Sequence, residues 1–507
     1  MSKGSRLVTL LGLLIASPVL AQPTEPAPSP TPAPTTPPTT TEPAPAPAPA
    51  PAPTEPTTQT PTPTPTAEPG AAGQPAYSVP LPQQGQPATP PAHFKTKWDT
   101  TFYGFVEADS IYDSTQGFND SAGNAAIARP NTYTGDHGQT TFGARNSRVG
   151  FKLGAPEYYG VKASAMLEMD FLGNQPTTAS ESQFWQNPAM RFRHYNVKLE
   201  TPVLDFLIGQ YWELFGWQSY FHPATVEIQG VPGQVYNRSP QIRIGKTIKT
   251  GVVDVDIAVA AVRPAERDSA TPDGQAGIKV SFPMLKAWHT GGSVSSALDS
   301  AAVGVSVIGR RFAVNPFPSG DSQVTKNGYG ISLDAMVPII PGHKENHDNA
   351  LTLTASYADG AGIADQYTGL SGGVGEPAVP NPGMLATAPT YTPNLDNGLA
   401  LFFKDADGTY SLHPIQWQSF IVGLQYYLPA GNVFVTANYS HMSSDNAADF
   451  GAAGKVFNSS DWADGNLFWD ATPAVRLGLE FAWFQQGYVD GVTATNYRTQ
   501  FSAFFIF

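Results

Sequence analysis

Residues Val161–Phe171 read VKASAMLEMDF, and every second side chain in this stretch is apolar. The apolar set is Val161, Ala163, Ala165, Leu167, Met169 and Phe171. Polar residues, among them Glu168 and Asp170, fall between them. Because successive side chains of a β-strand point to opposite faces, this period of two indicates a strand with one apolar and one polar face.

The same alternation recurs from residue 98 to the C-terminus. It predicts sixteen strands, at 98–110, 145–154, 160–172, 190–200, 204–214, 238–248, 251–263, 274–283, 300–312, 328–339, 350–359, 416–428, 432–443, 462–470, 474–486 and 497–507. Most are long enough for tilted membrane strands of about 9–11 residues, and short connections alternate with long ones, as in transmembrane barrels. Segment 284–299 is the exception, because it is longer than a turn and leaves room for another strand pair.

The last strand, Tyr497–Phe507, reads YRTQFSAFFIF and carries an apolar face that ends in Phe507. A C-terminal strand of this kind resembles the assembly signal of bacterial outer-membrane barrels. The alternatives are a secreted β-sandwich and a β-solenoid, but sixteen long strands exceed one sandwich and no short repeat is present. A closed sheet satisfies every backbone group in lipid and leaves no edge. We therefore predict an all-β fold, a transmembrane antiparallel β-barrel of about 16 strands.

The segment before the barrel divides into an export signal and a spacer. Lys3 and Arg6 precede an apolar run, and Ala21 ends a small-residue cleavage pattern, so residues 1–21 are predicted to be a signal peptide. Residues 22–97 are rich in Pro, Ala and Thr, which predicts a disordered periplasmic spacer. The spacer is either a passive linker or a contact to the cell wall. Residues 98–507 then form one barrel domain, although 507 residues alone would suggest about three domains.

Composition excludes several classes of function. The chain has no cysteine, so it has no disulfide, thiolate metal site or cysteine nucleophile. Its net charge of −13 argues against nonspecific nucleic-acid binding, which needs a basic surface. No segment has EF-hand spacing and the histidines show no paired ligand spacing, so we expect neither a metal nor a cofactor. No stretch after the signal peptide is apolar over about 18 residues, so no transmembrane helix is expected.

Four segments carry a family likeness: FYGFVEADSIYD at Phe102–Asp113, TFGARNSRVGFKL at Thr141–Leu153, FRHYNVKLETPVLDFLIGQYWELF at Phe192–Phe215 and NRSPQIRIG at Asn237–Gly245. They resemble segments of the DcaP-like family of trimeric sixteen-stranded porins. The second half of the chain is similar mainly in its alternation and its terminal Phe. The resemblance implies a passive homotrimer in the outer membrane, with affinity in some members for small anions such as dicarboxylates. The family usually carries a short periplasmic helical segment where this chain has the Pro-rich spacer.

Strand parity assigns charged side chains to the barrel interior. The predicted interior cations are Arg148, Lys152, Lys162, Arg243, Arg310, Arg476 and Arg498. The predicted interior acids are Glu107, Asp109, Glu168, Asp170, Asp254, Asp256, Asp334 and Glu480. Opposed basic and acidic walls would orient charged solutes, and the alternative is scattered charge that keeps the interior wet. Arg191 and Arg193 share parity with apolar neighbours, so either a bulge reverses the parity or this strand faces a neighbouring subunit.

The loop 215–237 occupies the third long-loop position, which folds inward in porins of the resembled kind. Glu227 is its only carboxylate, between His222 and Arg238, and is the candidate for the constriction. The alternative is a loop that packs on the wall through Trp217, Tyr220 and Phe221.

We expect a non-enzymatic channel for small hydrophilic solutes in the bacterial outer membrane. The alternatives are a phospholipase-type enzyme, which would need a Ser–His pair, and a tether from the outer membrane to the cell wall. The nearest Ser–His arrangement is His441 with Ser440 or Ser443, although adjacent residues of a strand point to opposite faces. The expected partners are membrane lipid, lipopolysaccharide, the barrel assembly machinery and further copies of the chain, with no nucleic acid.

Overall fold

The structure is a computed structural model in which residues 93–95 and 98–507 are described, except 117–119, 123–126, 175–184, 265–268, 292–293, 315–322, 345–346, 369–398, 405–409 and 451–456. The predicted signal peptide and nearly all of the predicted spacer lie outside these residues. A short strand, His93–Lys95, falls inside the range predicted as spacer. No helix of the described chain is long and apolar enough to cross a membrane.

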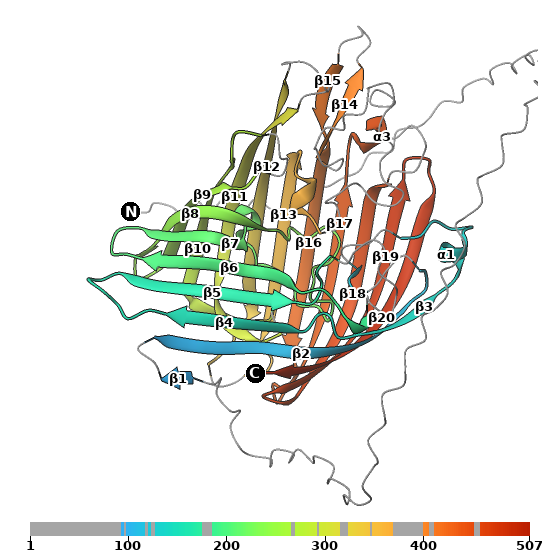
Figure 1. The fold of residues 1–507 in the computed structure, drawn as a ribbon. Helices are drawn as coiled ribbons and strands as arrows, with labels where there is room; N and C mark the ends of the chain where they lie inside the picture. The colour runs from blue at the N-terminus through green and yellow to red at the C-terminus, as the bar shows by residue number, and fades with distance from the viewer. Residues whose placement is uncertain are drawn as a thin grey trace, which may run out of the picture. The chain divides into compact units, whose positions relative to one another are not determined.

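Antiparallel strands make up most of the described chain (Figure 1). They are β1 His93–Lys95, β2 Asp99–Asp113, β3 Gln139–Gly143, β4 Arg148–Gly154, β5 Lys162–Asp170, β6 Arg191–Glu200, β7 Asp205–Trp212, β8 Arg238–Lys249, β9 Asp254–Val262, β10 Asp273–His289, β11 Ala297–Val314, β12 Val324–Ile340, β13 Leu351–Ala361, β14 Ala400–Lys404, β15 Tyr410–Pro414, β16 Gln416–Tyr427, β17 Val433–Ser443, β18 Phe457–Thr472, β19 Val475–Tyr488 and β20 Thr493–Ile506. The helical turns are α1 Tyr133–Asp136, η2 Phe215–Trp217, η3 Ala364–Gln366 and α3 Ala447–Phe450.

The strands close into a barrel because the last one pairs with the first long one. β20 lies antiparallel to β2, with Arg498 opposite Asp113 and Ile506 opposite Phe105. The C-terminal residue completes the seam, since the amide of Phe507 donates to the carbonyl of Gly104 at 3.0 Å. β3 and β4 both pair with β2 and act as two halves of one strand, and β1 pairs only with the start of β2. The predicted barrel of sixteen strands is thereby confirmed.

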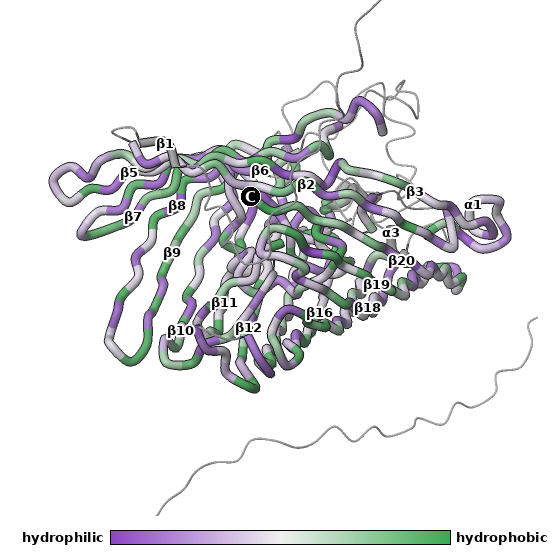
Figure 2. The backbone as a smooth tube through the Cα atoms, turned by 90° about the horizontal axis from the view of Figure 1, so that it is seen from below, coloured by the Kyte–Doolittle hydropathy of each residue, from purple (hydrophilic) through white to green (hydrophobic). Residues whose placement is uncertain are grey.

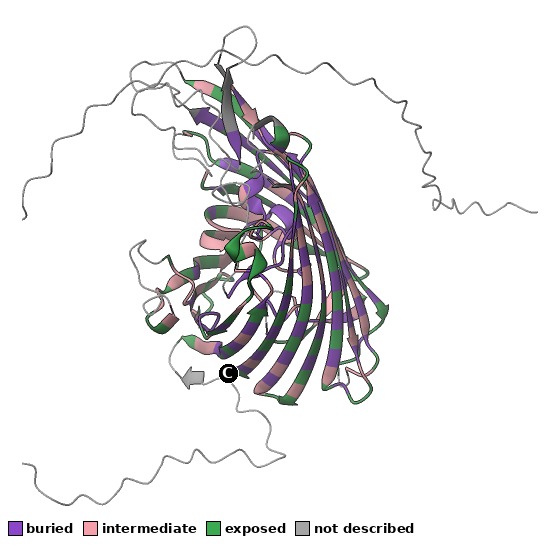
Figure 3. Cartoon of the chain, turned by 90° about the vertical axis from the view of Figure 1, so that its right-hand side faces the viewer, coloured by how far each residue is buried: buried purple, intermediate pink, exposed green. Residues whose placement is uncertain are grey.

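The two faces of each strand differ as the alternation predicts. On β11, Val303, Val305 and Val307 are exposed on the outside, while Ser306 between them is buried. Figure 2 shows the alternation of hydropathy along the tube, and Figure 3 shows buried and exposed bands alternating along the strands. The exterior is therefore an apolar surface suited to lipid, and the interior is polar.

The connections distinguish the two ends of the barrel. At one end, here called the short-turn end, the connections include 201–204, 250–253 and 473–474. At the other, the long-loop end, they include 213–237 and 362–399. Each predicted strand overlaps an observed one, but the described part of segment 284–299 holds no extra strand pair, because β10 and β11 extend into it from both sides. The long connection after β13 contains a hairpin, β14 and β15, that the sequence analysis did not predict.

Candidate functional site: the barrel interior

The connection between β7 and β8, residues 213–237 (loop 3), crosses the interior to the opposite wall. The carbonyl of Ala224 accepts hydrogen bonds from Thr436 Oγ1 at 2.8 Å and Asn438 Nδ2 at 3.0 Å. Ser440 Oγ donates to the carbonyl of Pro232 at 2.6 Å. These three polar residues lie on the inner face of β17, so the wall satisfies backbone groups that a buried loop would otherwise leave unpaired.

The base of loop 3 is fixed to the wall formed by β10 and β11. Gln275 Oε1 accepts from the amides of Leu214 and Phe215, each at 2.9 Å. Trp217 and Phe221 lie over Gly304, where an added Cβ would stand 2.9 Å from the Trp217 ring. Small residues on these strands thus make room for the large aromatics of the loop. The packing on the wall through Trp217, Tyr220 and Phe221, which was the alternative to a constriction at Glu227, is observed.

Glu227 lies in loop 3 as expected, but its carboxylate faces the wall. It is fully buried, 3.4 Å from Arg498 Nη2 and 3.3 Å from the amide of Ala122, and its own amide donates to Glu480 Oε2 at 2.9 Å. Arg498 is shared with Asp113 at 3.0 Å. Burial raises the pKa of Glu227 to about 8 against the opposing effect of Arg498. These contacts anchor loop 3 to the barrel wall. The suggestion from the sequence that Glu227 lines the constriction stays a prediction.

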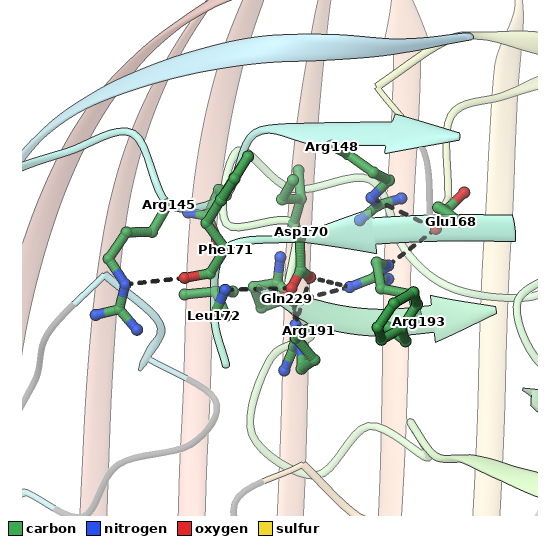
Figure 4. Close-up of polar contacts among 12 residues, drawn as sticks. Arg145, Arg148, Glu168, Asp170, Phe171, Leu172, Arg191, Arg193 and Gln229 are labelled. Carbon is green, nitrogen blue, oxygen red and sulfur yellow. Dashed lines mark hydrogen bonds and ion pairs between the residues drawn. The ribbon is translucent and has the colours of Figure 1, made fainter. Parts of the chain in front are cut away.

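A cluster of arginines and carboxylates faces loop 3 from β4, β5 and β6 (Figure 4). Arg193 pairs with Glu168 at 2.9 Å and with Asp170 at 2.8 Å, and Arg191 also reaches Asp170, at 2.6 Å. Both arginines donate to Gln229 Oε1 of loop 3, at 3.0 and 3.2 Å. The register shifts between Glu168 and Met169, so a bulge turns Arg193 inward. The bulge alternative is therefore correct for this strand.

The predicted interior residues divide into two groups by exposure. The buried ones are Glu107, Asp109, Arg148, Glu168, Asp170, Glu227, Arg310, Asp334, Arg476, Glu480 and Arg498. The partly or fully exposed ones are Lys152, Lys162, Arg243, Asp254 and Asp256. The exposed group lies entirely on β4, β5, β8 and β9. Water therefore reaches this wall, while some of the buried charges, such as Arg310 and Arg498, hold inserted segments in place.

Several buried charges make specific contacts, either with an inserted segment or within the barrel wall. Arg310 pairs with Asp273 at 2.7 Å and with Asp365 at 2.5 Å, which ties the connection after β13 to the wall. Asp109 accepts from Ser502 Oγ at 2.6 Å across the β2–β20 seam. Asp334 accepts from Ser332 Oγ at 3.0 Å on its own strand. These charged side chains inside the barrel thus pair with other groups of the protein.

A cavity of about 420 Å³ opens along the exposed wall. Four cations line it, Lys152, Lys198, Arg243 and Lys246, against two carboxylates, Asp205 and Asp256. Trp217 of loop 3 borders it as well. Lys198 was missed by the sequence analysis because the bulge at Arg193 obscured the parity of β6. The alternation downstream of Arg193, taken alone, would have placed it inside.

No family model and no curated protein matches the chain. The comparison with solved structures agrees with this architecture. Among solved structures, the outer membrane channel DcaP of Acinetobacter baumannii matches with a TM-score of 0.57 and 17% identity, over 83% of this chain and 100% of that one. The chain has the DcaP fold.

Two more solved structures match less closely. The anion-selective porin from Comamonas acidovorans gives a TM-score of 0.46 at 11% identity, over 81% of this chain and 100% of that one. The trimer form of OmpT from Vibrio cholerae gives 0.45 at 10% identity, over 81% and 99%.

The two Ser–His pairs considered for an enzyme, His441 with Ser440 or with Ser443, are not hydrogen-bonded in the described barrel, and Ser443 Oγ accepts from Gln418 Nε2 at 3.3 Å. Ser440 points into the interior, where its hydroxyl donates to Pro232. His441 points the other way, with its Nδ1 2.8 Å from Asp461 Oδ1. Among the described residues, no group of three or more His, Asp or Glu side chains is arranged to hold a metal ion.

Proposed function

We propose that the chain is an outer-membrane porin of the DcaP-like family, a passive channel for small hydrophilic solutes with a preference for small anions. The DcaP fold, the apolar exterior and the inserted loop 3 support the channel. The observation that carries the proposal is the 420 Å³ cavity beside loop 3, lined by four cations and two carboxylates. Cations facing water along a confined path favour the entry of anions.

We also propose how the barrel is oriented in the membrane and what precedes it in the chain. The short-turn end faces the periplasm, because outer-membrane barrels have short periplasmic turns and long outer loops. A cleaved signal peptide at 1–21 and a periplasmic spacer at 22–97 precede the barrel. The working unit is a homotrimer, inserted by the barrel assembly machinery with Phe507 as its signal.

Uptake into liposomes tests the channel function. Vesicles that contain the purified protein are placed in isotonic solutions of small sugars and of small dicarboxylates, and swelling is followed by light scattering. The proposal expects fast swelling with both, faster with the dicarboxylate than with a neutral solute of equal size. Vesicles that swell no faster than protein-free ones would overturn the proposal. Equal rates for the two solutes would remove the anion preference alone.

A further inference from the structure

Most of the charge along the 420 Å³ cavity is already paired within the protein. The pairs are Lys246 with Asp205 at 3.1 Å, Lys198 with Glu200 at 2.5 Å, and Asp256 with Lys279 at 3.3 Å. Among the described residues, this leaves Lys152 and Arg243 as the two cations of the cavity without a carboxylate at ion-pair distance. These two side chains are therefore the ones whose charge is available to a solute.

The two available cations are too far apart to hold one small solute between them. Lys152 is on β4 and Arg243 is on β8, with β5, β6 and β7 between them. Four strand spacings of about 4.8 Å place the two strands roughly 19 Å apart along the wall. Lys152 also turns away from β8, because its Nζ lies 4.8 Å from the centre of the Tyr103 ring on β2. A small solute thus meets one available cation at a time.

Arg243 is held in a fixed position by neutral groups. Its Nε donates to Gln241 Oε1 at 3.0 Å, and its Nη2 donates to the carbonyl of Trp212 at 2.5 Å. Its Nη1 makes no hydrogen bond within the part of the chain that the structure describes. Because neither acceptor is charged, the positive charge of Arg243 is not cancelled, and a carboxylate of a solute can accept from this guanidinium.

The wall beside Arg243 is formed by small residues. Gly245 follows on the same face of β8 and lies opposite Ala258 on β9, which in turn lies opposite Gly277 on β10. Trp217 of loop 3 covers Gly277, where an added Cβ would stand 3.0 Å from the indole Nε1. Gly245 and Ala258 line the cavity, as does Trp217. They form a shallow floor, here called the hollow, with the Trp217 ring at its edge.

Further apolar side chains lie around the same position. Leu207 on β7 lies directly opposite Arg243 in the β7–β8 pair. Leu207, Met166 and Tyr211 all line the cavity and are half-buried, so part of each side chain faces water. An apolar group that covers them removes this surface from water, which is favourable in proportion to the area covered. One anion position is thus surrounded by apolar surface.

We propose that the cavity is a binding site for monocarboxylates that carry an apolar ring, with the carboxylate on Arg243 and the ring in the hollow beside Trp217. This inference rests on the proposed porin function, which by itself accounts only for a preference for anions. Ring-to-ring contact with Trp217 adds to the burial of apolar area. A second carboxylate in place of the ring would lie on Gly245 and Ala258 without a partner, which is unfavourable.

The first test compares three solutes on the wild-type protein. Benzoate, acetate and succinate are each added to purified full-length protein in planar lipid bilayers, and the block of the potassium chloride current gives a dissociation constant. Benzoate is expected to bind at least about tenfold more tightly than acetate and succinate, the scale of one apolar group in a pocket. Equal constants for benzoate and acetate, or tighter binding of succinate, would overturn the proposal. A bilayer without any channel current would overturn the porin function itself.

The second test changes the apolar surface and leaves the charges in place. Leu207→Asn keeps the size of the side chain opposite Arg243 but makes it polar, so benzoate should bind about threefold to tenfold more weakly while acetate binds as before. Leu204→Asn is the matched control, because Leu204 is exposed in the turn before β7 and does not line the cavity. Its constants should equal those of the wild type. An unchanged benzoate constant in Leu207→Asn, or an equal loss in Leu204→Asn, would overturn the proposal.

Discussion

The Nε2 atom of His289 lies 2.7 Å from the main-chain carbonyl oxygen of His222. His289 ends β10 at the short-turn end, and His222 belongs to loop 3 from the long-loop end, so this contact joins segments inserted from opposite ends. Burial, with a contribution from His289, lowers the pKa of His222 to about 3, which keeps it neutral. The centre of the barrel is therefore packed, and the 420 Å³ cavity lies to one side of it, along β4–β9.

The packing of loop 3 against β11 can be tested with two glycines of that strand. Gly304→Ala places a Cβ 2.9 Å from the Trp217 ring, whereas Gly309→Ala meets no atom within 4 Å. We expect Gly304→Ala to lower the free energy of unfolding by about 1–3 kcal/mol, because the packed aromatic must shift. Gly309→Ala is the control. Urea titrations of both proteins in detergent measure the difference. Equal unfolding midpoints would contradict the packing of Trp217 over Gly304.

The buried carboxyl of Glu227 should make the free energy of unfolding of the protein depend on pH. The pKa rises from 4.5 to about 8 in the folded chain, because the carboxyl is buried and Glu480 is close, although Arg498 opposes the shift. Between these values the folded chain keeps a proton that the unfolded chain has lost, so stability falls as pH rises from about 4.5 to 8. Glu227→Gln should flatten this fall in the unfolding temperature.

Glu157→Gln provides the matched control for that experiment, since Glu157 is an exposed carboxylate in a short turn. Its profile should follow the wild type. A Glu227→Gln profile as steep as that of the wild type would show that the carboxyl of Glu227 is not responsible for the pH dependence.

Removal of Arg193 should be costly. The change Arg193→Ala leaves Glu168 and Asp170 buried with only their remaining partners. Breaking a buried ion pair in this way costs about 3–5 kcal/mol, because the remaining charge stays desolvated. Unfolding in urea measures the loss, with the exposed Arg263→Ala as control. A loss below about 1 kcal/mol would be typical of a surface pair and would contradict the buried arrangement.

Ion selectivity should respond to Arg243. Its side chain lines the 420 Å³ cavity and is held by Gln241 Oε1 at 3.0 Å and by the carbonyl of Trp212 at 2.5 Å. Arg243→Glu reverses a charge on the path and should move the reversal potential in asymmetric salt toward cation preference. Arg311→Glu, outside the path, should not. An unchanged potential in Arg243→Glu would show that ions do not pass this residue.

The sequence predicted the barrel well because alternation is a local property. Each strand shows which side chains share a face, as Glu168 and Asp170 do on β5, without knowledge of any partner strand. The bulge at Arg193 interrupts that rule, and for this reason the direction of its side chain stayed open. The hairpin of β14 and β15 escaped prediction because its strands are short and lie within a Gly- and Pro-rich loop.

The site was harder to predict because it depends on contacts between distant residues. Arg498 and Glu227 are 271 positions apart, and nothing near either residue indicates that they pair. The same holds for Arg476 and Val294, which are 182 positions apart and joined by a hydrogen bond. Parity told which charges face inward. Only the folded chain shows which of these charged side chains are buried against other groups of the protein. It also shows which of them, such as Lys152 and Arg243, remain accessible to water.

The conductance of the purified full-length protein in planar lipid bilayers tests the central claim most directly. A channel beside loop 3 predicts stepwise increases in current and, in a tenfold gradient of potassium chloride, a reversal potential with the sign of anion preference. A bilayer that shows no steps at any protein concentration would contradict the account.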